Sequence, residues 1–306
     1  MKKTLLLLIS ILTLTVYAEP GKSSWLDRTK QGAALATKIA LQLKSELEEL
    51  GINSADIIAE AKKNPAQFRV AVPEHHRKRF IVFSREHERI IADAFLEEMK
   101  KQGKLYTNAA DEARVRSIAE KITTVLPEKI PVKIYLVKDE TVNAFCLIDG
   151  SVFVHSGLLR TLKDDNQLAA VIAHEYGHAA ARHGAENLTK LMMKSAGAVY
   201  MSEVAKKNEQ AGKKTKGFLI KLGYGLGSEI GVFLPYQRTM EYEADKLGVL
   251  FMSKAGFDPH AMVDLFETFE KLSPDQDSPW NLLSTHPVHK KRIDHVKTVL
   301  QECCNK

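Results

Sequence analysis

A single pentapeptide, His174-Glu175-Tyr176-Gly177-His178, constrains the 306-residue chain more than any other feature. Residues i and i+4 lie one above the other on a helix face, so the two imidazoles of a helical pentapeptide can reach the same metal ion. Glu175 follows the first imidazole and would lie beside a water molecule on that ion, where a carboxylate can act as a general base. The pattern therefore predicts a metal-dependent hydrolase whose first two ligands share one helix.

The residues around the pentapeptide favour the helix that this chemistry requires. Asp164 and Asp165 are typical capping residues, and the segment 166–173 is rich in Ala and contains neither Gly nor Pro. Gly184 is a plausible end of the helix. We therefore expect a helix of about five turns. The alternative is an Ala-rich helix that carries two unrelated surface histidines.

A third ligand has to lie elsewhere in the chain, because a catalytic zinc ion normally has three protein ligands and keeps one position for water. A metzincin would have Gly at position 181 and His at position 184, but the chain has Ala181 and Gly184, which excludes that class. Glu203 lies at a thermolysin-like spacing after the pentapeptide, yet no carboxylate follows it four residues later. Glu203 is therefore the weaker candidate.

Glu241 and Asp245 form the better candidate pair, because they lie four residues apart on one face of a predicted helix. Glu241 could bind the metal ion while Asp245 accepts a hydrogen bond from a ligand or from groups near Glu175. Glu243 would point elsewhere. A solvated acidic start of a helix is the alternative for this segment.

Four ordered blocks between residues 104 and 300 resemble the HtpX-like and CAAX prenyl protease group of zinc metallopeptidases, which is metallopeptidase family forty-eight and of the gluzincin type. The blocks are Asn143-Ala144-Phe145 with 150–159, the motif helix 168–178 with His183 beyond it, 235–238 with the glutamate helix 241–248, and Thr285-His286-Pro287 with Arg292. The resemblance implies an α+β, predominantly helical fold, in which a zincin-like catalytic domain has a small β-sheet beside the motif helix. It also implies one Zn2+ per chain on His174, His178 and Glu241, with Glu175 as the general base and acid.

The developing oxyanion of peptide hydrolysis needs a further hydrogen-bond donor. The resemblance makes His286 and Arg292 of the late loop, and Tyr236 next to the glutamate helix, the candidates for this catalytic role. His286 has a second potential role as a fourth zinc ligand, which would displace the water and keep the enzyme latent. A loop histidine that merely precedes Pro287 is the third reading, and the sequence leaves all three open.

Two short segments with the pattern of β-strands precede the motif helix. Residues 132–136 alternate between apolar and polar types, and 151–155 fits a second strand. We expect the second strand to offer a sheet edge on which an extended substrate peptide could lie as an added strand. The expected substrate-binding positions are Asn143, Ser151, Val152, Phe153 and Val154. An ordinary interior strand is the alternative.

The first eighteen residues have the pattern of a secretory signal peptide, with basic Lys2 and Lys3, an apolar run over 5–16 and the small Ala18 before a cleavage site. The apolar run is too short to span a bilayer. The formal net charge of +6 falls to +4 without Lys2 and Lys3, which permits contact with an anionic membrane surface and does not indicate nucleic-acid binding. We therefore expect a periplasmic chain, with peripheral membrane contact as an option.

Length and pattern predict three parts of the chain. These are a signal peptide over 1–18, a helical N-terminal segment over 19–103 that packs on the catalytic unit, and a zinc metallopeptidase domain over 104–306. Within the last part, residues 217–234 are apolar and rich in Gly, but Lys221 and Glu229 interrupt the run. This interruption favours a buried or membrane-touching helix over a membrane span.

Cysteine usage predicts no particular disulfide. The chain has three cysteines, and Cys146 could pair with Cys303, with Cys304 or with neither. Cys303 lies four residues from the end of the sequence, but the residues after it are not aliphatic and the chain is expected to be exported. Prenylation is therefore rejected.

The leading hypothesis is a periplasmic zinc endopeptidase that hydrolyses peptide bonds of misfolded or misassembled envelope proteins, outer-membrane proteins among them. The substrate class follows from the resemblance alone. Prenyl-protein processing is disfavoured, because the many membrane spans of those relatives are missing, and no tetratricopeptide tail is visible. The alternative is an exported chaperone or assembly factor that retains a structural or latent zinc site and binds clients without cutting them.

Overall fold

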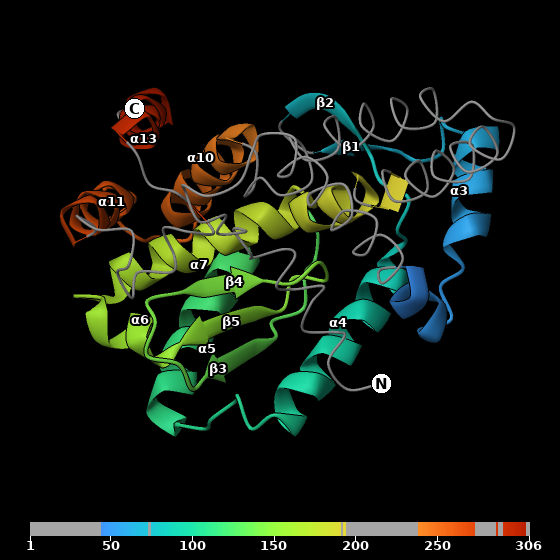
Figure 1. The fold of residues 1–306 in the computed structure, drawn as a ribbon. Coiled ribbons are helices and arrows are strands. Elements are labelled where there is room, and N and C mark those ends of the chain that lie inside the picture. Colours follow the sequence, from blue (N-terminus) through green and yellow to red (C-terminus); the bar gives the residue numbers. More distant parts are fainter. Residues whose placement is uncertain are drawn as a thin grey trace, which may run out of the picture. The chain divides into compact units, whose positions relative to one another are not determined.

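The computed structural model describes residues 44–72, 75–190, 192–193, 238–272, 286 and 290–303. The chain divides into two compact units, and the unit that contains the pentapeptide comprises Ala71–Arg77, Glu88–Gly184 and Pro235–Lys306. The predicted signal peptide, Glu203, Tyr236 and the apolar segment 217–234 lie outside the described residues. The expected class is confirmed, because helices predominate and one small mixed sheet lies beside the motif helix (Figure 1).

The helices and strands follow one another along the chain in an order that puts the sheet before the motif helix. They are α3 Ser54–Lys63, β1 Arg69–Val72, β2 His75–Phe80, α4 Arg85–Lys101, α5 Ala109–Thr123, β3 Ile134–Val137, β4 Ala144–Cys146, β5 Val152–His155, α6 Ser156–Thr161, α7 Asp165–Ala180, α10 Arg238–Lys254, α11 Ala261–Leu272 and α13 Lys290–Cys303. Strands β1 and β2 form a separate two-stranded sheet. The predicted boundary between residues 103 and 104 stays a prediction.

The three-stranded sheet has the order β3-β5-β4. Strand β5 pairs in parallel with β3, where Ile134 lies opposite Val152, and antiparallel with β4, where Ala144 lies opposite Val154. Both predicted strands are therefore confirmed. The prediction that the second strand has a free edge is wrong, because β5 is the central strand and β4 forms one edge.

The residues of strand β5 are buried on both faces of the sheet. Val152, Phe153 and Val154 are all 0% exposed, so neither face of the strand meets solvent. An uninterrupted apolar run of this kind is typical of a strand covered on both faces, whereas a half-exposed strand alternates. Phe153 stacks on Phe145 of β4 at 5.0 Å between ring centroids, and Phe95 of α4 approaches it edge-on at 5.3 Å. The interior alternative is the correct reading of this segment.

Helix α7 carries the pentapeptide and begins where the sequence indicates. The side chain of Asp164 accepts a hydrogen bond from the backbone N–H of Gln167 at 2.9 Å, which caps the first turn. The helix ends at Ala180, before the predicted end at Gly184, because Arg182 has a left-handed backbone with φ of 53°. Residues 183–190 are helical again. The predicted end at Gly184 is therefore wrong.

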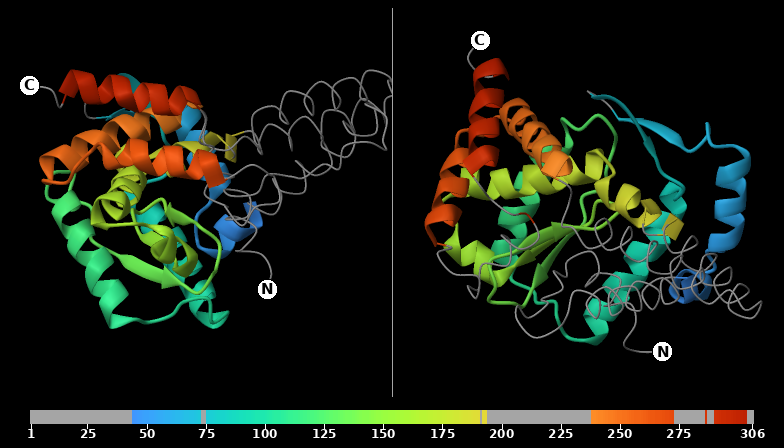
Figure 2. Two further views of the ribbon diagram at one scale, coloured as in Figure 1. Left: turned by 90° about the vertical axis from the view of Figure 1, so that its left-hand side faces the viewer. Right: turned by 45° about the horizontal axis from the view of Figure 1, so that its top comes forward.

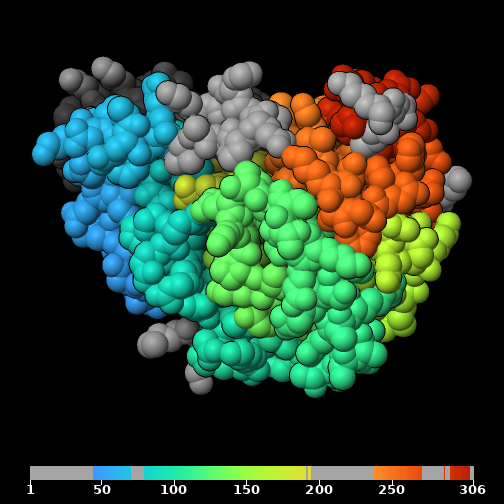
Figure 3. Space-filling view, turned by 180° about the vertical axis from the view of Figure 1, so that it is seen from behind, coloured from blue at the N-terminus to red at the C-terminus, as the bar shows by residue number. Residues whose placement is uncertain are grey.

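Helix α10 lies directly against α7, and two glycines allow this close approach. A Cβ atom added to Gly177 would lie 2.7 Å from the carbonyl oxygen of Ala244, and one added to Gly248 would lie 3.2 Å from the backbone nitrogen of His174. Helices α11 and α13 also contact this pair, and Figure 2 shows α10, α11 and α13 gathered around α7. In the space-filling view, the green surface around α5 adjoins the orange surface of α10 and α11 (Figure 3).

We expect Gly177→Ala to lower the free energy of unfolding by about 1–3 kcal/mol, because the new methyl group forces the backbones of two packed helices apart. Urea unfolding of the purified chain measures this change. Gly184→Ala is the matched control, because its added Cβ would meet Ile148 at 3.5 Å, an ordinary contact distance. Equal stability of Gly177→Ala and the wild type would contradict the tight crossing of α7 and α10.

Two smaller expectations concern the membrane and the cysteines. None of the helices in the described part of the chain is both long and apolar enough to cross a lipid bilayer.

Cys146 and Cys303 both have free thiols, and Cys304 lies outside the described residues. The structure therefore does not contain a disulfide between Cys146 and Cys303.

Candidate metal centre

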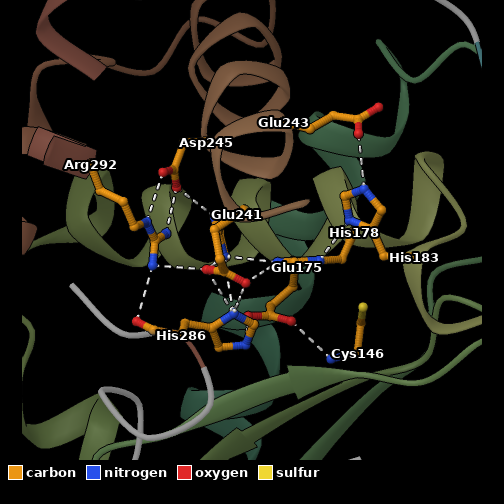
Figure 4. Close-up of polar contacts among 10 residues, drawn as sticks. Cys146, Glu175, His178, His183, Glu241, Glu243, Asp245, His286 and Arg292 are labelled. Carbon is orange, nitrogen blue, oxygen red and sulfur yellow. Dashed lines mark hydrogen bonds and ion pairs between the residues drawn. The ribbon is translucent and has the colours of Figure 1, made fainter. Parts of the chain in front are cut away.

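Four buried side chains direct one donor atom each toward a common point: His174 and His178 of α7, Glu241 of α10, and His286. Figure 4 shows His178, Glu241 and His286 of this group. These donor atoms all lie within 4.8 Å of one another. His174 Nε2 is 3.1 Å from His178 Nε2 and 3.3 Å from His286 Nδ1. Glu241 Oε1 is 3.4 Å from His178 Nε2 and 3.1 Å from His286 Nδ1.

The donor set and its spacing fit zinc. Nitrogen and oxygen ligands bind zinc at about 2.0–2.1 Å in a tetrahedron, so neighbouring donors are expected roughly 3.4 Å apart. The separations among His174, His178 and Glu241, and from His286 to His174 and Glu241, are 3.1 to 3.6 Å, which is close to this edge length. Three imidazoles and one carboxylate are also the donor types that zinc prefers among protein side chains.

The crossing of α7 and α10 explains why these donors meet. His174 and His178 are one helical turn apart and lie on the side of α7 that faces α10. Glu241 belongs to the first turn of α10 and is only 2% exposed. Because both helices approach closely at Gly177, the carboxylate of Glu241 reaches the two imidazoles. The solvated alternative for the start of α10 is therefore wrong.

Asp245 and Arg292 form hydrogen bonds and ion pairs with the candidate ligands on the side away from the donor atoms. Asp245 Oδ1 lies 3.0 Å from His174 Nδ1, as the spacing along α10 predicts. The guanidinium of Arg292 donates two hydrogen bonds to Asp245, at 2.8 and 2.6 Å, and Arg292 Nη1 lies 2.8 Å from Glu241 Oε2. The same nitrogen donates to the backbone carbonyl of His286 at 3.0 Å. Arg292 thus binds both carboxylates of the centre, and its role as an oxyanion donor stays a prediction.

Electrostatics keep the Glu241 carboxyl charged. Burial opposes its ionisation, but the charges of His286 and Arg292 outweigh burial and hold the pKa of Glu241 well below its usual range. Burial likewise acts on Asp245, and the Arg292 guanidinium overrides it, so the pKa of Asp245 is lowered. Both carboxylates are therefore available as ligand and as hydrogen-bond acceptor at neutral pH.

Glu175 lies beside the donor cluster and is not part of it. Its Oε2 accepts a hydrogen bond from the backbone N–H of Cys146 in β4 at 2.9 Å, and its Oε1 lies 3.6 Å from His286 Nε2 (Figure 4). Burial raises the pKa of the Glu175 carboxyl, and the nearby His286 and His174 oppose this effect only in part. The environment of Glu175 therefore favours the protonated carboxyl more than water does.

Two residues, His183 and Glu243, lie behind the donor cluster without a role that their spacing in the sequence predicts. His183 Nδ1 lies 2.8 Å from His178 Nδ1, and His183 Nε2 lies 3.2 Å from Glu243 Oε2. Glu243 does point away from the donor cluster, as expected. Its carboxylate contacts His183, which in turn contacts the ligand His178. Helical periodicity could not have revealed this contact, because the left-handed backbone of Arg182 separates His183 from α7.

Of the five predicted substrate-binding positions, only Asn143 lies next to an edge strand of the sheet. Ser151, Val152, Phe153 and Val154 are buried, and three of them form the central strand, so they cannot receive an added strand. Asn143 immediately precedes the edge strand β4 and remains a predicted substrate-binding position. The strand edge next to Glu175 therefore belongs to β4.

Comparisons with known proteins agree with this site. The sequence model of peptidase family M48 matches residues 108–300. Mitochondrial metalloendopeptidase OMA1 of Schizosaccharomyces pombe is 33% identical over 235 residues, which cover 76% of this chain and 66% of that protein. The OMA1 of Arabidopsis thaliana is 36% identical over 165 residues, or 54% of this chain and 31% of the relative.

A bacterial relative matches the same region. The beta-barrel assembly-enhancing protease of Escherichia coli is 28% identical over 165 residues, which cover 54% of this chain and 34% of that protein. The chain thus spans between about one third and two thirds of the length of the relatives that it matches. The family match extends over more than half of the chain and includes all four donors. The chain therefore belongs to peptidase family M48.

Proposed function

We propose that the chain is a zinc-dependent metalloendopeptidase that hydrolyses polypeptides. The observation that carries this proposal is the convergence of four buried donors, all within 4.8 Å of one another, with the carboxyl of Glu175 beside them. Glu175 differs from Asp245, because its carboxyl lies 3.6 Å from His286 Nε2 on the donor side of the centre, where a general base can act on zinc-bound water. Membership of a peptidase family supports the same reading.

The side chains of the centre have separate tasks in this proposal. His174, His178 and Glu241 would hold the zinc ion, which when bound supplies Lewis-acid chemistry: it acidifies water and polarises a carbonyl group. Glu175 removes a proton from the attacking water and delivers it to the nitrogen of the leaving amine. The raised pKa of its carboxyl suits both steps, because the group has to accept and then release a proton.

His286 has the geometry of a fourth donor. Its Nδ1 lies 3.3 Å from His174 Nε2 and 3.1 Å from Glu241 Oε1, within the spacing of the other ligands. A zinc ion with four protein ligands keeps no position for water. We therefore propose that this arrangement is a latent state and that His286 has to leave before hydrolysis begins.

Removal of zinc is expected to abolish cleavage of an unfolded protein such as casein by the full chain. EDTA should stop the reaction, and added zinc should restore it, because the donor cluster is the only source of Lewis acidity in this proposal. Fragments on a gel measure cleavage, and metal analysis measures zinc. A chain that holds one zinc ion and cuts neither casein nor an envelope protein, even as His286→Ala, would contradict the proposal.

We further propose that residues 1–18 export the chain and that it acts in the periplasm on misfolded or misassembled envelope proteins. The basic and apolar start of the sequence supports export, and the name of the Escherichia coli relative supports a substrate related to β-barrel assembly. Other relatives are named as mitochondrial, so export itself needs a test. A mature N-terminus at Glu19 in the periplasmic fraction would support this compartment, and an uncleaved cytoplasmic chain would contradict it.

A second candidate function is an exported assembly factor that binds clients without cutting them. The closed set of four donors favours it, because a zinc ion with four protein ligands is typical of structural sites. This candidate predicts that His286→Ala binds unfolded outer-membrane proteins but leaves them intact. The endopeptidase proposal predicts fragments from the same variant.

A further inference from the structure

Behind the donor cluster, a buried histidine and a carboxylate form a second layer of contacts around one zinc ligand. His183 is 0% exposed and contacts His178 on the ring edge opposite the donor atom, with 2.8 Å between the two Nδ1 atoms. The ring planes are 70° apart, and the ring centroids are 4.8 Å apart. The carboxylate of Glu243 lies 3.2 Å from the other nitrogen of His183.

A local break in the helix creates this contact. In an uninterrupted helix, residue 183 would lie about 140° around the axis from residue 178 and could not face it. The left-handed backbone of Arg182, with φ of 53°, ends α7 and turns the chain back toward His178. A non-glycine residue seldom adopts this conformation without support from its surroundings.

The support comes from Glu88 in α4. Arg182 Nε donates a hydrogen bond to Glu88 Oε1 at 3.1 Å, and the same carboxylate pairs with another nitrogen of the guanidinium. Glu88 is 0% exposed, so this ion pair is shielded from solvent. The turn that presents His183 is thus held by a charge pair between segments 94 residues apart in sequence.

The partners of each ring determine where its protons lie. His178 Nε2 faces the donor cluster and has to keep its lone pair for a metal ion, so its proton is on Nδ1. That proton is donated to His183 Nδ1, and the remaining proton of His183, on Nε2, is donated to the carboxylate of Glu243. Glu243, the last acceptor in this series of hydrogen bonds, therefore selects the metal-binding tautomer of His178.

We propose that His183 and Glu243 are positioning residues that fix the orientation and tautomer of the zinc ligand His178. This inference rests on the proposed zinc site. His174 has a carboxylate directly behind it, because Asp245 Oδ1 lies 3.0 Å from its Nδ1, whereas His178 reaches its carboxylate through a second imidazole. Hydrogen-bond partners of this kind typically change metal affinity by about 10–100-fold when they are removed.

The test is the zinc dissociation constant of the full chain, measured by competition with a chelator. We expect His183→Phe, which keeps a ring but loses both nitrogens, to weaken zinc binding by about 10–100-fold. Glu243→Leu should weaken binding in the same direction. Glu243→Gln should restore most of the affinity, because its amide oxygen still accepts the proton of His183 Nε2. The d–d spectrum of the cobalt-loaded chain should change in His183→Phe and remain close to the wild type in Glu243→Gln.

His155→Phe is the matched control. His155 is a buried histidine of β5 whose Nδ1 lies 2.8 Å from the hydroxyl of Thr141, so its replacement perturbs folding without touching the donor cluster. Unfolding of the metal-free chains separates loss of fold from loss of affinity. If His183→Phe does not fold, the pair Glu243→Leu and Glu243→Gln decides alone.

The outcomes distinguish the two proposals. Wild-type zinc affinity in both His183→Phe and Glu243→Leu would overturn the positioning role and leave the peptidase proposal intact. Equal loss of affinity in Glu243→Leu and Glu243→Gln would also overturn it, because the hydrogen bond would then be irrelevant. A wild-type chain that binds no zinc would instead refute the proposed metal centre itself.

Discussion

Replacement of Glu175 by Gln is expected to lower kcat for casein cleavage by about 10²–10⁴-fold while zinc stays bound. Gln has the same shape and can still accept the backbone N–H of Cys146, which is 2.9 Å from Glu175 Oε2 in the wild type. The amide cannot take a proton from water, so only the acid–base step is lost. KM should change little, because Glu175 is not expected to bind the resting substrate.

The measurement is the rate of fragment formation at equal zinc content, with metal analysis of each preparation. Glu120→Gln is the matched control, because Glu120 is an exposed residue of α5 and should tolerate the same chemical change. If the enzyme is latent, the assay is carried out with His286→Ala added to both variants. A Glu175→Gln chain that retains more than about a tenth of the wild-type rate would refute the role of this carboxyl as the general base.

Replacement of His286 by Ala is expected to raise the cleavage rate. The imidazole occupies the fourth donor position, with Nδ1 3.1 Å from Glu241 Oε1, so its removal leaves room for water at the centre. If about 1–10% of wild-type molecules are open at any time, complete opening raises the rate roughly 10–100-fold. The measurement is casein cleavage at saturating zinc.

The opposite result also has a clear meaning. If His286 is the donor to the oxyanion, His286→Ala should lower kcat by about 10²–10³-fold, and the latency proposal would be wrong. His260→Ala is the control, because His260 is an exposed residue and should leave the rate unchanged. Zinc content has to stay near one ion per chain in both variants, since a loss of metal would lower the rate for a different reason.

Local periodicity was sufficient to predict the ligands on helices. His174 and His178, like Glu241 and Asp245, are pairs four residues apart, and the helix converts that spacing directly into a shared face. The resemblance supported Glu241 as third ligand and added the candidate His286. The structure brings all four donors within 4.8 Å of one another.

Features that depend on distant contacts could not be predicted in this way. The end of α7 depends on an ion pair of Arg182 with Glu88, and these two residues are 94 positions apart. The central position of β5 depends on the strands that pair with its two edges, which the sequence of a four-residue strand does not specify. The role of His183 was missed for the same reason, because it requires both the turn and Glu243.

The division of the ligands between α7 and α10 makes the stability of the fold a function of free zinc. A metal ion bound to both helices but not to the unfolded chain adds about 2.7 kcal/mol at one hundred times its dissociation constant and about 4.1 kcal/mol at one thousand times. The chain should therefore melt at a temperature that rises with the zinc concentration of its surroundings. In a compartment with little free zinc, loss of the metal ion would abolish the proposed activity and destabilise the packing of α7 against α10.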